Sequence, residues 1–330
     1  MVDNHQRERK CLYNLLDNFK KGKNIMLPSK RLDYSPIIDR PPLKLPAGAR
    51  VVVWPVVNVE VWDIKRPMPR QVLPPPTNIT RLPDFAHWAW HEYGMRVGFW
   101  RMKQALDDLD IKASLFTNAR VCTDYARVAE EALKSGWEFV GHSYDQQPMH
   151  VEQDQRALIR RTVNIIKDFT GKAPLGWLSP GLTETYYTPD YLAEAGIQYI
   201  ADWIIDDEPC DIRTGHGNVV AMPYNVECND IPMMMVQHHS SSEFVTRTMD
   251  HFERLYDEGK TRAKIMAIGM HPYISGVAHR IKYFETVFKT LRRKPGVLFW
   301  TGEQILDWHN RQRKSPVHPL PATMTRRRKS

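Results

Sequence analysis

The residues best suited to acid–base chemistry follow predicted strands, where apolar side chains would otherwise be expected. Asn58 and Glu60 end the first strand, His142 follows another, and His271 follows the apolar run Ile265–Met270. The carboxyl ends of the strands in a parallel barrel lie on one face, so a carboxylate and two histidines from separate strands can meet there. Such a group is equipped for general acid–base hydrolysis, with or without a metal ion.

Further acidic residues follow a fourth strand-like segment, namely Asp202, Asp206 and Asp207. The pair Asp206-Asp207 either contacts a ligand or holds a turn or helix cap. Taken alone, a histidine after a strand is more often a hydrogen-bonded structural residue than a catalytic one. The combination of such residues on several strand ends is what indicates an active site.

The elements that must position these residues alternate between strand and helix. Strands are predicted at 51–61, 112–119, 138–142, 176–178, 198–203, 219–224, 232–237, 265–270 and 297–300. Helical spacing of apolar residues predicts helices near 99–109, 128–133, 158–169, 242–258 and 281–291. Alternation of this kind predicts an α/β fold with a parallel sheet, and its length favours a closed or nearly closed barrel.

The basic charge of the chain lies mainly at its two ends. The net charge is +8 over 330 residues, of which residues 1–31 carry +5, residues 311–330 carry +7 and residues 32–310 carry −4. We therefore expect an N-terminal arm (1–46), a barrel domain (47–310) and a solvated basic tail. Nucleic-acid binding would favour basic residues on a structured face, so no nucleic-acid partner is expected.

The composition is that of a globular protein, with 42% hydrophobic and 25% charged residues. No run approaches the ~18 apolar residues of a membrane span, and the N-terminal segment lacks the apolar core of a secretory signal. We expect a cytoplasmic protein with a small-molecule substrate and no membrane association. The arm is long enough to embrace a neighbour, which favours a homo-oligomer.

Several short motifs resemble those of the polysaccharide deacetylases with NodB homology, carbohydrate esterase family 4, over residues 48–310. They include Glu92-Tyr93-Gly94, Val97-Gly98-Phe99-Trp100-Arg101, Gly141-His142-Ser143-Tyr144, Pro174-Leu175-Gly176-Trp177, Asp206-Asp207-Glu208-Pro209, Asn229-Asp230 and Ile268-Gly269-Met270-His271. The chain is most similar to the allantoinase-like branch, which hydrolyses a cyclic amide. The resemblance implies a distorted (β/α)7 barrel, formed by a single domain.

Departures from the family pattern fall on its metal ligands. The deacetylases carry two aspartates after the first strand, and here the pair is Glu60-Val61. They also carry two histidines four residues apart, and here Gln146 follows His142. Valine is no zinc ligand and glutamine is a poor one. The resemblance to the allantoinase-like branch therefore implies no metal and no other cofactor. The alternative is a divalent metal such as zinc, held by His142 with His150, Glu60 or another aspartate.

The resemblance also assigns roles. Glu60 is expected to activate water, His271 to protonate the leaving nitrogen, and His142 to polarise the substrate carbonyl. Substrate contacts are expected from Asn58, Tyr144, Trp177, Asp206, Asp207 and Arg280. Asn229 and Asp230 either contact the ligand or form a turn.

The predicted function is hydrolysis of a non-peptide carbon–nitrogen bond in a small cyclic amide or ureide such as allantoin. One alternative is a zinc-dependent N-deacetylase of an amino sugar or polysaccharide. Another is a non-catalytic barrel that binds a small ligand or a partner protein.

Overall fold

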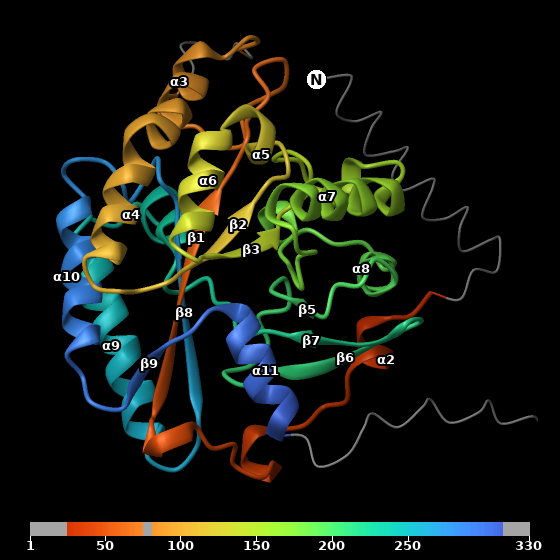
Figure 1. Ribbon diagram of the computed structural model, residues 1–330, viewed down its shortest axis with the longest axis vertical. Coiled ribbons are helices and arrows are strands. Elements are labelled where there is room, and N and C mark those ends of the chain that lie inside the picture. The colour runs from red at the N-terminus through yellow and green to blue at the C-terminus, as the bar shows by residue number, and fades with distance from the viewer. Residues whose placement is uncertain (1–24, 75–80, 313–330) are drawn as a thin grey trace, which may run out of the picture.

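The computed structural model describes residues 25–74 and 81–312, which form a curled sheet flanked by helices (Figure 1). The strands are β1 (Val51–Val59), β2 (Ser114–Thr117), β3 (Glu138–Gly141), β4 (Gly176–Trp177), β5 (Tyr199–Ile200), β6 (Cys210–Thr214), β7 (Gly217–Ala221), β8 (Lys264–Met270) and β9 (Val297–Phe299). Their order is β6-β7-β5-β4-β3-β2-β1-β8, with β9 paired to β1. Only β6 and β7 are antiparallel. The distorted barrel predicted from the sequence is confirmed.

Helices connect the strands and cover the outside of the sheet. The longer ones are α3 (Phe85–Tyr93), α4 (Phe99–Asp107), α6 (Ala126–Lys134), α7 (Gln155–Thr170), α8 (Thr188–Glu194), α9 (Glu243–Glu258), α10 (Ile281–Arg292) and α11 (Gly302–Gln312). Short helical turns are α2 (Pro28–Arg31), α5 (Val121–Asp124), η1 (Ile37–Asp39), η2 (Pro46–Gly48), η3 (Gly94–Gly98), η4 (Met149–Val151), η5 (Pro180–Leu182) and η6 (Ile231–Val236). Figure 1 shows α4, α9 and α10 together on one side of β1 and β8.

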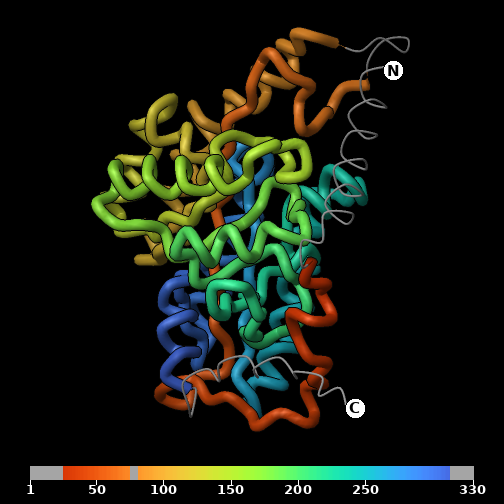
Figure 2. The backbone as a smooth tube through the Cα atoms, turned by 90° about the vertical axis from the view of Figure 1, so that its right-hand side faces the viewer, coloured from red at the N-terminus to blue at the C-terminus, as the bar shows by residue number. Residues whose placement is uncertain are grey.

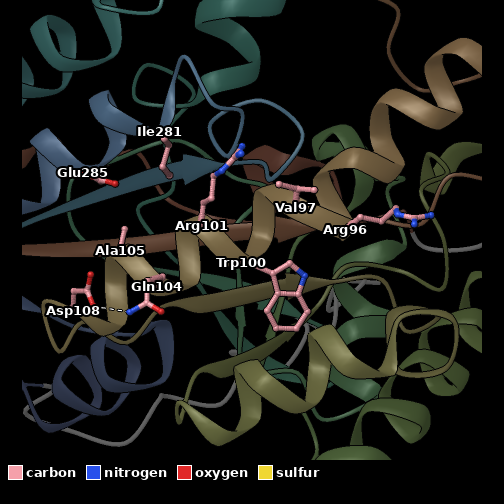
Figure 3. Close-up of a pocket in the computed structure, with 9 residues that line it drawn as sticks. All are labelled: Arg96, Val97, Trp100, Arg101, Gln104, Ala105, Asp108, Ile281 and Glu285. Carbon is pink, nitrogen blue, oxygen red and sulfur yellow. Dashed lines mark hydrogen bonds between the residues drawn. The ribbon is translucent and has the colours of Figure 1, made fainter.

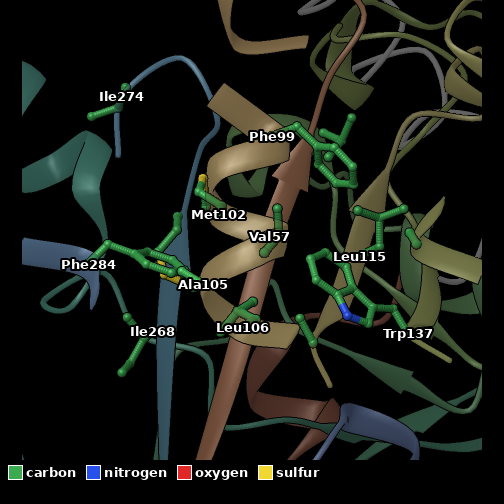
Figure 4. Packing of buried hydrophobic residues seen from close by; sticks show 14 of the residues in the cluster. Val57, Phe99, Met102, Ala105, Leu106, Leu115, Trp137, Ile268, Ile274 and Phe284 are labelled. Atoms are coloured by element: carbon green, nitrogen blue, oxygen red, sulfur yellow. The ribbon is translucent and has the colours of Figure 1, made fainter. Parts of the chain in front are cut away.

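β1 is buried on both faces, which explains its almost unbroken run of valines. Val53 and Val57 point outwards into the layer formed with α4 and α10, part of which Figure 4 shows. Trp54 points into the barrel, where its ring meets Phe116, Tyr199 and Tyr224 edge-on. The barrel interior is therefore filled with aromatic side chains below the ends of the strands.

The ladder of paired strands is not continuous between β7 and β8. The chain at 225–229 lies along β8 instead, where Asn225 Nδ2 donates to Ala267 O (2.9 Å) and Gly269 N donates to Cys228 O (2.9 Å). This segment leads directly into Asp230, beside the end of β8. The irregular part of the barrel thus delivers an acid to the carboxyl end of the sheet.

Several elements differ from the sequence prediction. The expected strand at 232–237 is wrong, because this segment forms the π-helical turn η6. Asn229 Oδ1 accepts from Ile231 N (3.0 Å) and Pro232 follows at the start of the turn, so the local geometry favours a helix. β6, α3, α8 and α11 were not predicted; the pattern of β6 is only partly apolar, and α11 begins at a glycine.

The described part of the arm, from residue 25 onwards, packs along the base of the barrel (Figure 2). Arg31 is fully buried and pairs with Asp190 (2.6 Å), and Lys44 O accepts from Trp308 Nε1 (3.0 Å). The basic tail beyond residue 312 lies outside the described residues. No helix in the described ranges has the length and apolarity to cross a membrane.

Candidate active site

Glu60, the first residue after β1, is the most heavily hydrogen-bonded carboxylate at this end of the barrel. Its Oε2 accepts from Trp62 Nε1 (2.7 Å) and Tyr273 OH (3.2 Å), and its Oε1 accepts from Gln146 Nε2 (3.0 Å). His271 Nε2 lies 3.5 Å from the same Oε1. The side chain is only 2% exposed. Burial alone would raise its pKa, but contact with His271 and its charge outweigh burial and lower the pKa of Glu60 to about 2.

His271 is held by an acid on its other side. Its Nδ1 lies 2.6 Å from Asp230 Oδ1, and its backbone N–H donates to Asp230 Oδ2 (2.7 Å). Ser275 Oγ also donates to Oδ2 (2.6 Å). Burial would lower the pKa of His271, whereas the charges and contacts of Asp230 and Glu60 raise it to about 9. At neutral pH the three groups therefore form a chain of carboxylate, imidazolium and carboxylate.

His142, which follows β3, differs from His271 in its charge. Its Nδ1 lies 2.7 Å from the carbonyl oxygen of Leu178, and a carbonyl only accepts, so Nδ1 carries the proton. Burial is the main cause that lowers the pKa of His142 to about 4. The neutral ring presents a bare Nε2 that accepts but does not donate. The expected role of His142 in polarising a carbonyl is corrected here, because that role needs a donor.

The residues at the family's metal-ligand positions do not form a metal site. Val61 has no donor atom in its side chain, and both ends of the Gln146 amide are already used. Its Nε2 donates to Glu60, and its Oε1 accepts from Asn118 Nδ2 (3.3 Å). His150 lies exposed on η4. Across residues 25–74 and 81–312, no group of three or more histidine, cysteine or acidic side chains could hold a metal ion. The donor set does not fit a divalent metal.

Aromatic side chains from α3 and the loops cover the site. The Trp62 ring stacks on His91 with centroids 4.7 Å apart, and Tyr273 meets the rings of Trp62 and Trp90 edge-on. His91 Nε2 lies 2.9 Å from the carbonyl oxygen of Glu60. Like Glu60, His142 and His271 are almost fully buried, at 2% and 4% exposure. The acid–base groups are therefore buried beneath aromatic side chains.

Two glycines allow α3 and α4 to approach the loop after β8. A Cβ at Gly98 would lie 2.0 Å from the carbonyl oxygen of Pro272, and one at Gly94 would lie 2.6 Å from Tyr273 N. Both glycines sit in η3, a π-helical turn of the kind often found near functional sites. These contacts explain the Gly94 and Gly98 motifs physically, because they fix the loop that carries His271.

The structure places three of the expected substrate contacts near the ends of the strands, two of them in structural roles. Asn58 is buried, and its Nδ2 donates to Met270 O (3.3 Å). Trp177 is fully buried, and its Nε1 donates to Ser179 Oγ (3.1 Å). The Tyr144 ring lies 3.6 Å from the guanidinium carbon of Arg161. The expectation that Asn58 and Trp177 contact substrate is corrected, because both side chains are buried and their donors are used within the fold. A substrate contact of Tyr144 stays a prediction.

Asp206 and Asp207 lie at the opposite end of the sheet. Asp206 pairs with Arg40 (2.8 Å), and Asp207 pairs with Lys264 (2.9 Å), the first residue of β8. Lys264 pairs in register with Val51 at the start of β1, and seven residues of β8 then rise about 3.3 Å each towards the site. The predicted substrate contact of these two acids is therefore corrected to an ion-paired anchor for the arm and β8.

Arg280 lies near Asp230, whose charge acts on it. Its Nε donates to Ser241 Oγ (3.2 Å). Burial lowers the pKa of Arg280, while the charge of Asp230 opposes this shift. It stands near the acid that holds His271 and does not touch Glu60.

A cavity of about 630 Å³ lies apart from these groups, between η3, α4 and α10 (Figure 3). Trp100, Arg101 and Ile281 line it, and Glu60, His142 and His271 do not.

Sequence reasoning missed the roles of Asp230 and Tyr273. The sequence allows either a ligand contact or a turn for Asp230, whereas in the structure it holds His271. Tyr273 and Arg70 come from loops whose conformation no periodic pattern predicts. Arg70 is half-buried, and its Nε is buried without a hydrogen-bond partner. A cluster of proline residues around Arg70 marked this segment only as irregular.

A family model and two curated proteins are similar to this chain. The family model for polysaccharide deacetylase matches residues 91–200. A putative polysaccharide deacetylase of Schizosaccharomyces pombe is 24% identical over 257 residues, covering 70% of this chain and 77% of the relative. A peptidoglycan deacetylase of Helicobacter pylori is 22% identical over 246 residues, covering 64% and 83%.

Solved structures share the fold. A probable polysaccharide deacetylase from Pseudomonas aeruginosa PAO1 superposes with a TM-score of 0.73 at 22% identity, covering 83% of this chain and 95% of the other. PuuE allantoinase superposes with a TM-score of 0.75 at 22% identity, covering 86% and 100%. These matches, together with the motifs that build the site, support the resemblance of the chain to the polysaccharide deacetylase superfamily with NodB homology, carbohydrate esterase family 4.

Proposed function

We propose that the protein is a hydrolase of non-peptide carbon–nitrogen bonds, which opens a small cyclic amide or ureide such as allantoin without a metal ion. The observation that carries this proposal is the buried chain Asp230–His271–Glu60, in which a cation lies 3.5 Å from a carboxylate. These are an acid and a base in the protonation states that amide hydrolysis needs. The resemblance to the deacetylase superfamily and the likeness to PuuE allantoinase support the reaction class.

The two groups divide the proton transfers between them. The oxygen of a water molecule attacks the acyl carbon, the proton of the water passes to Glu60, and the carbonyl π pair moves to the acyl oxygen. When this intermediate collapses, the C–N bond pair leaves with nitrogen, which takes the proton from His271 Nε2. The proton on Glu60 then returns to His271, so the products are a carboxylic acid and an amine. Each such transfer contributes about 10²–10⁴-fold.

His142 fits this scheme as an acceptor. Its bare Nε2 can take a hydrogen bond from the attacking water or from a substrate N–H, and its Nδ1–H is fixed by Leu178. The positioning of water or a ring N–H then needs no charge on His142.

Access to the site supports a small substrate. The three central residues are 2–4% exposed, under a cover of Trp62, Trp90 and Tyr273. A polysaccharide chain needs an open cleft along which several sugar units can lie, whereas a planar ring fits between aromatic side chains. Assembly as a homo-oligomer and a cytoplasmic location stay predictions.

A substrate screen with metal analysis tests the proposal. Purified protein is assayed with allantoin, hydantoins, cyclic imides and chito-oligosaccharides, and the metal content of the same sample is measured. We expect ring opening of a cyclic amide by protein that contains far less than one metal ion per chain. Stoichiometric zinc with deacetylation of chito-oligosaccharides would contradict it, and binding without turnover would favour a non-catalytic barrel.

A further inference from the structure

Amide hydrolysis places a negative charge on the acyl oxygen, and this charge needs a donor. A family metal would supply one, but the donor set here does not fit a metal. The side-chain donors around the site are already committed: Trp62 Nε1, Tyr273 OH and Gln146 Nε2 all donate to Glu60. His142 presents a bare acceptor. The remaining question is which charged donor in the described part of the chain is still free.

Arg70 is such a donor. It makes no hydrogen bond or ion pair with any described residue, and its Nε is shielded from solvent. Another arginine of the same loop, Arg66, is exposed and pairs with Asp145 (3.2 Å) and Asp63 (3.7 Å). A half-buried guanidinium without an acidic partner is costly, because it has lost part of its hydration and gained no anion in return. Its planar fork suits a carboxylate or another oxyanion.

The loop that carries Arg70 is anchored next to the aromatic cover on one side and to α3 on the other. Met68 is buried in the same cluster as Trp62 and Tyr273. After Arg70, Leu73 N donates to His87 Nε2 (3.0 Å), and His87 Nδ1 is held by Asp84 (2.6 Å) at the start of α3.

Electrostatics agree with this position. Burial and the two histidines act most strongly on the pKa of Glu60, and the charge of Arg70 adds to their effect. Burial is also the main cause for His142, whose pKa the charge of Arg70 lowers further. The charge of Arg70 therefore acts on both groups that face the reacting amide.

We infer that Arg70 binds the acyl oxygen of the substrate, stabilises the oxyanion of the tetrahedral intermediate, and then holds the product carboxylate. This inference rests on the proposed function and names the group that replaces a metal in it. Its N–H groups donate to the oxygen that gains the carbonyl π pair when water attacks. No proton is transferred to or from Arg70. A guanidinium placed there also favours substrates whose ring opening releases a carboxylate.

Kinetics of Arg70 variants test the inference, with Arg66→Ala as the matched control from the same loop. We expect Arg70→Ala to lower kcat about 10²–10³-fold, the usual loss of one oxyanion donor, with little change in KM. Arg70→Lys should retain part of kcat, because it keeps the charge and loses the fork. Guanidinium chloride at non-denaturing concentration should restore Arg70→Ala more than sodium chloride of equal strength. Arg66→Ala should leave kcat and KM unchanged.

A change in the basicity of Glu60 cannot explain the expected loss of kcat in Arg70→Ala. Removing the Arg70 charge should raise the pKa of Glu60 and make it a stronger base, so a fall in kcat cannot come from a weaker base. Wild-type kcat in Arg70→Ala, or a rise in KM alone, would overturn the inference.

Binding of allantoate, the ring-opened carboxylate of allantoin, gives a readout that is independent of turnover. Calorimetry should show binding to wild type and to Arg66→Ala, and at least tenfold weaker binding to Arg70→Ala. If wild type turns over no amide, the proposed function fails, and the Arg70 site still stands if this difference is seen. Equal affinity of wild type and Arg70→Ala overturns it.

Discussion

Two glutamates lie at opposite ends of the same barrel and hold opposite protonation preferences. At the carboxyl end, Glu60 faces the cation His271, and its pKa falls to about 2 although the side chain is buried. At the other end, Glu138 accepts from Ser114 Oγ (2.5 Å) and Tyr199 OH (2.7 Å), and burial raises its pKa. The partner determines the outcome, because neutral hydroxyls do not offset burial as a cation does.

The difference separates the chemical end of the barrel from its structural end. Around Glu138, Ser114 Oγ also accepts from Trp54 Nε1 (2.8 Å) and Gly302 N (3.0 Å), so this network, with Tyr199, ties four strands to the start of α11. It closes the barrel without fixing a charge pair. The group around Glu60 keeps two carboxylates and an imidazolium, which is useful only where protons must move.

The largest expected effect comes from replacing Glu60 with glutamine, and the same replacement at Glu138 is the comparison. Glu60→Gln should lower kcat/KM about 10²–10⁴-fold, because the group that takes the proton of water is lost. Glu138→Gln is the matched control and should leave kcat/KM within about twofold, since it changes only a network of neutral donors. Steady-state kinetics on the amide found in the screen measure both. Equal losses in the two variants would remove the distinction between the ends.

A smaller loss of kcat/KM is expected when His271 loses its contact with the Asp230 carboxylate. Asp230→Asn should lower kcat/KM about tenfold to hundredfold, and the alkaline limb of the pH profile should move to lower pH, because Asp230 raises the pKa of His271. Asp207→Asn serves as control, since Asp207 pairs with Lys264 at the structural end. Activity lost in Asp207→Asn would restore the substrate role that the sequence predicted for it.

Stability should respond at the structural end while the chemistry stays intact. A Cβ at Gly302 would lie 2.3 Å from Tyr199 OH, so Gly302→Ala should destabilise the fold by about 1–3 kcal/mol. Turnover per folded molecule should stay unchanged. Gly215→Ala is the control, because its Cβ would meet only Asp190 Oδ1 at 3.6 Å. Urea unfolding measures the change, and equal stability of the two variants would contradict the tight packing at Gly302.

The pH dependence of kcat/KM in the wild-type protein tests the charges assigned to Glu60, His142 and His271 without any substitution. Glu60 is ionised above about pH 2, and His271 stays protonated up to about pH 9. Protonation of His142, with a pKa of about 4, removes the acceptor at the acid end. We therefore expect kcat/KM to stay constant between about pH 4 and pH 9, measured in buffers of constant ionic strength. An alkaline limb near pH 6.5 would show that His271 is an ordinary histidine.

The regular part of the molecule was predictable from the sequence because its patterns are local. The valine run of β1, the stripe of α4 and the apolar β8 each carry their own period, and polar residues at strand ends pointed to Glu60, His142 and His271. These three predicted residues do lie at one end of the barrel, where their charges act on one another.

What could not be predicted depends on contacts distant in the sequence. Asp206 and Asp207 look like site residues until the structure shows Arg40 and Lys264 beside them. The charge of His142 depends on the carbonyl of Leu178, which no side-chain pattern reveals. Arg70 lies in a proline-rich loop, where neither helical nor strand periodicity places a side chain.

At the carboxyl end of the barrel, a buried imidazolium faces a carboxylate, and an ¹⁵N NMR titration of His271 measures its charge. We expect a pKa of about 9 in wild type and in Glu138→Gln, and a lower pKa in Glu60→Gln, because Glu60 and Asp230 together hold the proton on the ring. A pKa near the ordinary 6.5 in wild type would contradict this expectation.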